Sequence, residues 1–82
     1  MSDATSGTTV HHVDARGLHC PLPVQELSRA IAAAEIGALV ELTATDPTAR
    51  IDVPVWCRLQ RHRLRRITEV EGGWRFRVER AR

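Results

Sequence analysis

The chain has 82 residues, of which 27% are charged, and a formal net charge of +2 at pH 7. A chain of this length forms one small domain with a single two-layer core, because only about 60% of its unfolded surface can be buried on folding. An enclosed active-site cavity within one protomer is therefore not expected, and a site on an exposed loop or helix end is favoured. No run of about 18 apolar residues occurs, which predicts that no segment spans a membrane.

The N-terminal sequence MSDATSGTTVHH is polar and contains neither Lys nor Arg, unlike a signal peptide. We therefore expect a cytoplasmic protein whose 2 cysteines are free thiols and not a disulfide. Residues 1–9 are small, polar and without periodicity, which predicts a disordered tail. Residues 10–82 are then expected to form the single domain.

Charge is distributed unevenly along the chain. Residues 1–57 hold three arginines and seven acidic residues, whereas residues 58–82 hold nine arginines and three acidic residues. A basic C-terminal third suits RNA or an acidic protein surface. It equally suits a solvated sheet face and helix side, which is the commoner origin of such a pattern.

The first half of the domain is predicted to contain two strands and a helix. Residues 10–15 can form a short strand, and residues 21–35 carry a stripe of apolar side chains at helical spacing. That stripe consists of Val24, Leu27, Ile31 and Ala34. Gly37 is a natural stop after this helix. Residues 38–45 (ALVELTAT) then alternate between apolar and polar side chains, as a half-buried strand does.

The second half begins with a turn at Asp46 and Pro47 and is predicted to continue as a helix over 49–63. This helix is indicated by an apolar row at spacing four, formed by Ile51, Val55 and Leu59, with Trp56 beside it. Because Pro54 falls early in the segment, Asp52 is a possible cap for a helix that begins just after it.

The last third is predicted to form a hairpin, because residues 64–70 and 74–80 flank the turn sequence Glu-Gly-Gly. The element order is therefore β-α-β-α-β-β. A crossover through a helix makes the first two strands parallel, and both helices then pack on one face of the sheet. We expect an α+β fold, a two-layer sandwich with a four-stranded mixed sheet.

Cys20 lies at the start of the first helix, in the sequence HCPLP that begins at His19. Unpaired N–H groups and the helix dipole favour a negative charge at that position, which predicts a lowered thiol pKa and a partly ionised thiol. Arg16 and His19 are expected to add positive charge. Pro21 and Pro23 preset the backbone of the first turn and make the approach to the sulfur rigid.

The motif contains no second cysteine, because Pro23 stands where a thioredoxin-like site has one. Without a resolving thiol, Cys20 cannot close a local disulfide and release a bound sulfur. Such a thiol suits holding a sulfur atom as a persulfide and passing it to the thiolate of another protein. The alternative is a cysteine that happens to precede a helix.

The sequence LHCPLP, preceded by VDARG and followed by an amphipathic helix, resembles the TusA/SirA family of small sulfur carriers. The similarity extends through ATDPTARIDVPVWCRLQRHRL and the closing hairpin, and so covers the chain from about Val10 onward. The resemblance implies a βαβαββ sandwich and a catalytic persulfide on Cys20. It also implies site-shaping roles for the other residues of the motif and its upstream loop, which are Asp14, Arg16, Gly17, His19, Pro21 and Pro23.

The resemblance further implies that sulfane sulfur comes from a cysteine desulfurase or a rhodanese-like donor and is relayed to an acceptor protein. The family's destinations include tRNA thiolation, molybdenum-cofactor metabolism and sulfur oxidation, and neither transfer step needs a metal or an organic cofactor. Many members carry a lysine in the first helix, where this chain has only Arg29. A partner contact that depends on the lysine does not carry over.

Other candidate residues have structural interpretations that are more common. Cys57 could be a second sulfur site or a resolving thiol, but a free cysteine inside a helix is usually buried. His11 and His12 point to opposite faces of a strand, and Cys57 and His62 lie about 140° apart around a helix. The sequence therefore favours no metal site. Asp14 and Arg16 either shape the Cys20 loop or are solvated, and the aromatic side chains suit a core better than a base-stacking surface.

Two other classes of function compete with sulfur transfer. One is a nucleic-acid-binding module that uses the arginines of residues 58–82 and binds RNA with a steep salt dependence. The other is a regulatory interaction protein with the same fold and no sulfur chemistry. Direct nucleic-acid binding is not expected, and the Cys-Pro-Leu-Pro sequence argues against a regulatory protein without sulfur chemistry.

Overall fold

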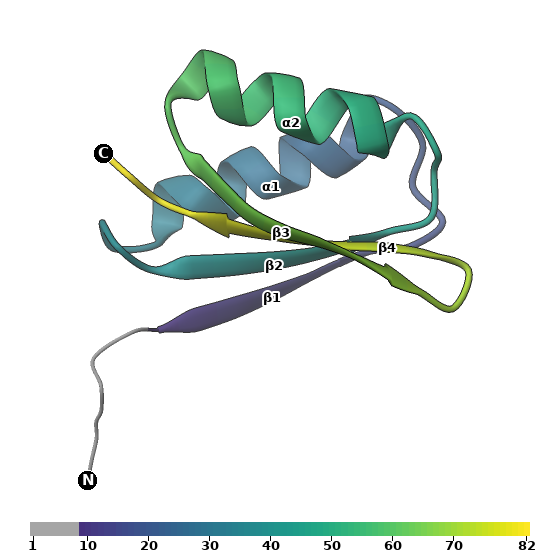
Figure 1. The fold of residues 1–82 in the computed structure, drawn as a ribbon, viewed down its shortest axis with the longest axis horizontal. Helices are drawn as coiled ribbons and strands as arrows, with labels where there is room; N and C mark the ends of the chain where they lie inside the picture. Colours follow the sequence, from purple (N-terminus) through teal and green to yellow (C-terminus); the bar gives the residue numbers. More distant parts are fainter. Residues whose placement is uncertain (1–8) are drawn as a thin grey trace, which may run out of the picture.

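A computed structural model describes residues 9–82 and contains two layers, a four-stranded sheet and a pair of helices that cover one of its faces (Figure 1). The elements in chain order are β1 (Val10–Ala15), α1 (Leu22–Ala33), β2 (Leu39–Ala44), α2 (Ala49–Gln60), β3 (Arg63–Val70) and β4 (Gly73–Glu79). The predicted α+β class and the β-α-β-α-β-β order are confirmed. The predicted tail, apart from Thr9, lies outside the described residues.

The strands are arranged in the order β1-β2-β4-β3. β1 and β2 are parallel, as expected for strands joined through a helix, and the other two pairings are antiparallel. Because β1 and β2 run in the same direction, the loops that follow them leave the sheet at the same edge. Residues 16–21 and 45–48 therefore come together, although Cys20 and Asp46 are 26 positions apart in the sequence.

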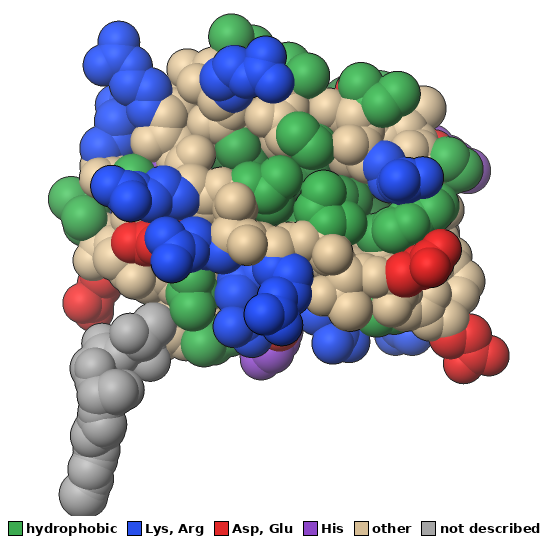
Figure 2. Space-filling view, viewed as in Figure 1, with side chains coloured by type: hydrophobic (Ala, Val, Ile, Leu, Met, Phe, Trp, Pro, Cys, Tyr) green, Lys and Arg blue, Asp and Glu red, His purple; other side chains and the backbone are tan. Residues whose placement is uncertain are grey.

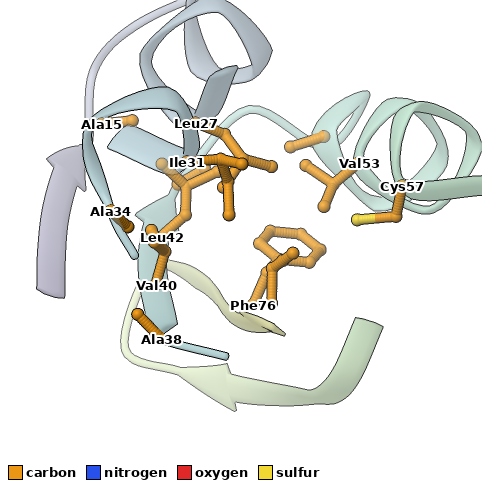
Figure 3. Packing of buried hydrophobic residues seen from close by; sticks show 13 residues of the cluster. Ala15, Leu27, Ile31, Ala34, Ala38, Val40, Leu42, Val53, Cys57 and Phe76 are labelled. Atoms are coloured by element: carbon orange, nitrogen blue, oxygen red, sulfur yellow. The ribbon is translucent and has the colours of Figure 1, made fainter. Parts of the chain in front are cut away.

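The core lies between the helices and the inner face of the sheet. Phe76 of β4 and Leu42 of β2 are fully buried there, against Leu27 of α1 and Val53 of α2. Figure 3 shows side chains from both helices converging over Phe76. Burial of each such side chain contributes about 1.5–3 kcal/mol, which makes this cluster the main support of a small domain.

The first helix confirms the predicted stripe: Leu27, Ile31 and Ala34 are buried, and Val24 packs against them. Its ends differ slightly from the prediction of 21–35, since Pro21 occupies the N-cap position and Ala34 is already extended, with ψ of 163°. Gly37 follows in a turn with φ of 92°, and its N–H donates to the carbonyl of Arg80.

The second helix corrects the prediction that Asp52 is a possible cap. It begins at Ala49, after Thr48 at the N-cap, so Asp52 lies in its first turn and does not cap it. Its apolar row does not face the core: Ile51 is 67% exposed and Leu59 is 70% exposed. The buried face carries the smaller side chains Ala49, Val53 and Cys57 instead. Figure 2 shows apolar side chains at the surface over α2.

The second helix also ends before residue 63. Arg61 adopts a left-handed φ of 63°, and the N–H groups of Arg61 and His62 close the last turn on helix carbonyls. A non-glycine residue in this conformation gives no sequence signal of the kind that glycine gives. The helix is therefore three residues shorter than predicted at this end.

The predicted hairpin is present, with Glu71 and Gly72 at its turn and β4 starting at Gly73. Gly72 has φ of 77°, which a side chain would disfavour. Gly73 is needed for another reason, because a Cβ atom there would lie 2.2 Å from the carbonyl oxygen of Ala44. This close approach brings the hairpin against the end of β2.

Several arginines of the basic C-terminal third have partners within the protein. Arg77 pairs with Glu41, and Arg65 pairs with Glu79, on the outer face of the sheet. Glu41 is only 8% exposed, so its carboxylate needs a partner within the protein, and Arg77 supplies it. The hydrogen bond from Arg77 lowers the pKa of Glu41. These ion pairs fit the solvated sheet face that the sequence favoured.

Candidate functional site

Cys20 lies in the loop between β1 and α1, two residues before the helix begins, and is exposed. The N–H of Leu22 donates to the carbonyl of His19, which closes a tight turn around the thiol. Pro21 is exposed in this turn, whereas Pro23 is buried at the second position of α1. Both prolines therefore lie at the start of the helix, and the sulfur is accessible.

Two carboxylates approach Cys20 from the loop after β2 and from α2. The backbone N–H of Cys20 donates to Oδ2 of Asp46 over 2.8 Å, and the Sγ atom donates to Oδ2 of Asp52 over 3.1 Å. Asp46 also accepts the N–H of Thr48 over 3.1 Å, so its two oxygens join the two loops. The site is therefore built from three segments that the parallel strands bring to one edge.

This arrangement reverses the expected ionisation of the thiol. The hydrogen bond to the Asp52 carboxylate, partial burial and the negative charges of Asp52 and Asp46 all raise the pKa of Cys20, against a smaller opposing hydrogen bond from Thr48. The prediction of a lowered pKa was wrong because it considered only the helix end. It omitted the acidic side chains that the other loop places there.

The basic groups expected to assist the thiol lie beside carboxylates instead. Arg16 forms a two-point contact with Asp14, with Nε and Nη2 at 2.8 and 2.9 Å from the carboxylate oxygens. This pair lowers the pKa of Asp14 to about 2. The side chain of His19 is 89% exposed, and its Nδ1 atom lies 4.0 Å from Asp46.

Asp14 and Arg16 nevertheless shape the loop, because the backbone N–H of Arg16 also donates to Asp14. The next residue, Gly17, has φ of 81° and donates its N–H to Oγ1 of Thr45 over 2.9 Å. This contact fastens the Cys20 loop to the loop after β2. The structure therefore brings all the predicted motif residues to one edge of the sheet, where the thiol of Cys20 contacts Asp52 and the imidazole of His19 lies near Asp46.

Cys57 lies on the buried face of α2 with 2% of its surface exposed, and burial raises its pKa to about 11. His62 stacks against Trp56 with ring centroids 5.4 Å apart, and burial lowers its pKa. Within residues 9–82, no three His, Cys, Asp or Glu side chains gather as a metal site would require. No helix of this part of the chain is long and apolar enough to cross a membrane.

Two open hollows lie on the outer face of the sheet, with volumes of about 410 and 310 Å³. Charged side chains line both of them, among them Arg66 and Arg77 in the first and Arg16 and Arg75 in the second. Neither hollow includes Cys20. The thiol is instead exposed on a loop outside both hollows, which suits contact with another macromolecule better than enclosure of a small molecule.

Asp46 and Asp52 were not identified as site residues from the sequence. Asp46 was interpreted as a turn residue and Asp52 as a helix cap. The predicted parallel pairing of the first two strands could have indicated Asp46. The carboxyl ends of parallel strands lie at the same edge of the sheet, so the loops that follow them meet there.

Comparison with known proteins agrees with this architecture. The family model described as Sulfurtransferase TusA matches residues 11–80. The chain belongs to the TusA family. A sulfur carrier protein TusA from Pseudomonas putida is 34% identical over 76 residues, which cover 93% of this chain and 91% of the relative.

Other TusA relatives give the same result. A sulfur carrier protein TusA from Pseudomonas syringae is 38% identical over 65 residues, covering 78% of this chain and 77% of the relative. The crystal structure of a SirA-like protein from Desulfitobacterium hafniense matches 90% of this chain and all of its own with a TM-score of 0.75. At 19% identity, this last similarity concerns the fold alone.

Proposed function

We propose that this chain is a sulfur carrier that holds sulfane sulfur as a persulfide on Cys20 and passes it to a partner protein. The observation that carries the proposal is the exposed thiol in the Cys-Pro-Leu-Pro loop, since the other cysteine, Cys57, is buried in α2. With no second accessible thiol beside it within residues 9–82, Cys20 suits transfer between proteins better than closure of an internal disulfide.

The proposed loading step is an exchange at sulfur. The Sγ atom of Cys20 forms a bond with the outer sulfur of a donor persulfide, and the S–S bond within the donor breaks. The proton of the Cys20 thiol ends on the donor cysteine, which leaves as a thiol. The delivery step is the same exchange with an acceptor cysteine. Atoms and electrons balance in both steps, so we propose no metal or organic cofactor.

We propose that the donor is a cysteine desulfurase or a rhodanese-like protein and that the acceptor serves tRNA thiolation, cofactor sulfuration or sulfur oxidation. The exchange requires reduced thiols, so we place it in the cytoplasm. The exposed row on α2, formed by Ile51, Val55 and Leu59, supports a protein partner, because Asp52 within this segment reaches Cys20. Contiguous exposed apolar side chains commonly mark protein contacts.

The proposal is tested by loading. The reduced protein is incubated with a cysteine desulfurase and cysteine, and its intact mass is measured beside those of Cys20→Ser and Cys57→Ser. We expect a gain of about one sulfur atom in the wild type and in Cys57→Ser, and none in Cys20→Ser. If Cys20→Ser gained sulfur normally, or if the wild type gained none from either the desulfurase or a thiosulfate–rhodanese donor, the proposal would be wrong.

The partner is tested by changing the exposed row without touching the thiol. We expect Leu59→Ser to slow loading by the desulfurase several-fold and to leave loading by glutathione persulfide unchanged, because only the protein donor covers α2. Arg58→Ser, one residue away on the exposed side, is the matched control. Equal slowing with both donors would show that the variant disturbs the thiol and not a contact.

A further inference from the structure

The carboxylate of Asp52 is placed differently from the other acid at the site. Asp46 accepts two backbone N–H groups and lies near His19, so its charge is compensated. Among residues 9–82, Asp52 makes no ion pair, and its Oδ2 atom accepts the Cys20 thiol at 3.1 Å. A negative charge that has no ion-pair partner among residues 9–82 therefore lies directly against the atom that would carry the sulfur.

This contact favours the empty carrier over the loaded one. The empty thiol has a proton and can donate to Asp52. A persulfide is more acidic than a thiol and is ionised near neutral pH, so the loaded side chain has no proton to donate. Its charged outer sulfur, one S–S bond of about 2.05 Å beyond Sγ, stays within about 5 Å of the carboxylate and is repelled.

We propose that Asp52 favours release of sulfur from Cys20 by stabilising the empty thiol and repelling the loaded persulfide anion. This inference rests on the proposed function and names the residue that sets the equilibrium between the empty thiol and the loaded persulfide. In delivery, the outer sulfur bonds to an acceptor cysteine and its bond to Sγ breaks. The proton of the acceptor thiol ends on Sγ, where Asp52 accepts its hydrogen bond. No oxidant or reductant is required, because sulfur moves between two thiols.

The experiment measures an equilibrium and not a rate. The protein is equilibrated with glutathione and glutathione persulfide at neutral pH and low salt, and the loaded fraction is read by intact mass. We expect Asp52→Asn to raise the equilibrium constant for loading roughly tenfold, because it removes both the charge and the charge-assisted hydrogen bond. Asp52→Glu retains the charge, so its equilibrium constant for loading should lie close to that of the wild type.

A second readout separates this role from simple structural support. The rate of Cys20 alkylation by iodoacetamide is followed against pH, which reports ionisation of the empty thiol. Asp52→Asn should move this profile to lower pH, because the hydrogen bond and charge that raise the pKa of Cys20 are lost. The other groups that act on the thiol, which are Asp46 and Thr48, remain in place, as does His19 beside Asp46.

The control is Glu35→Gln, which removes one exposed carboxylate beyond the opposite end of α1. It should change neither the loading equilibrium nor the alkylation profile. If folded Asp52→Asn loads to the same extent as the wild type, the inference is wrong while the proposed function stands. If glutathione persulfide loads Cys20→Ser as well as the wild type, the proposed function itself is wrong.

Discussion

The pKa values of both cysteines are raised, but for different physical reasons. At Cys20 the main cause is a hydrogen bond to the neighbouring carboxylate of Asp52, on a loop that is open to solvent. At Cys57 the cause is burial, with 2% of the residue exposed in the core beneath α2. The comparison teaches that the direction of the pKa shift does not distinguish the two thiols, whereas access to solvent does.

The largest expected difference is in alkylation. Iodoacetamide should modify Cys20 in the native protein, whereas Cys57 can react only after α2 separates from the core. If opening approaches the free energy of global unfolding, about 5 kcal/mol or more, native protection of Cys57 is on the order of 10³-fold or greater. Mass spectrometry of digested samples gives both rates, and urea should abolish the difference. Similar alkylation rates of the two cysteines in the native protein would contradict this prediction.

The next effect is a loss of stability at alkaline pH. The folded-state pKa of Cys57, about 11, exceeds the ordinary thiol pKa of 9.0, so the folded chain retains a proton that the unfolded chain loses. The stabilisation is complete below pH 9 and is lost as pH rises toward 11, by roughly 2 to 3 kcal/mol. The chain has 0 tyrosines and no lysine, so no other type of side chain has its ordinary pKa in this window.

Urea unfolding followed by circular dichroism at pH 8, 9, 10 and 11 measures this loss. Cys57→Ala is the informative variant, because it removes the buried thiol and should flatten most of the slope. The exposed Cys20 contributes in the same direction, so Cys20→Ala is measured beside it. A slope that survives in Cys57→Ala and disappears in Cys20→Ala would contradict the assignment.

The smallest effect concerns substitution by serine near neutral pH. Cys57→Ser buries a hydroxyl without an assured partner and should lower the free energy of unfolding by about 1–2 kcal/mol. Cys20→Ser exchanges one exposed polar group for another and should change it by less than about 0.5 kcal/mol. Equal losses in urea unfolding would show that the Cys20 loop supports the fold as strongly as the core does.

The fold was predictable because its signals are local and repeated. The helical stripe of α1, the alternation of β2 and the glycines of the hairpin each agree with the element that formed. The parallel pairing of β1 and β2 followed from the intervening helix. The inner face of α2 was not predictable in this way, because its buried side chains, Ala49, Val53 and Cys57, are smaller and less hydrophobic than the exposed row.

The position of the Cys20 thiol was predictable from the sequence, but the prediction of its surroundings was incomplete. The motif placed the thiol before a helix, which local sequence determines. The acids that control its ionisation come from residues 46 and 52, and their positions depend on how two loops meet in space. Local reasoning therefore located the exposed thiol but gave it the wrong electrostatic environment.

The C-terminal residues hold the end of the molecule that is farthest from the thiol. Arg80 donates to the carbonyl of Ala34 at the C-terminal end of α1, and Arg82 donates to the carbonyl of Gln60 at the end of α2. Cys20 lies at the other end of α1, and Figure 1 shows the C-terminus on the opposite side from the loops that form the site. A tether attached by a linker after Arg82 would thus leave the carrier's reactive end facing away from a solid support.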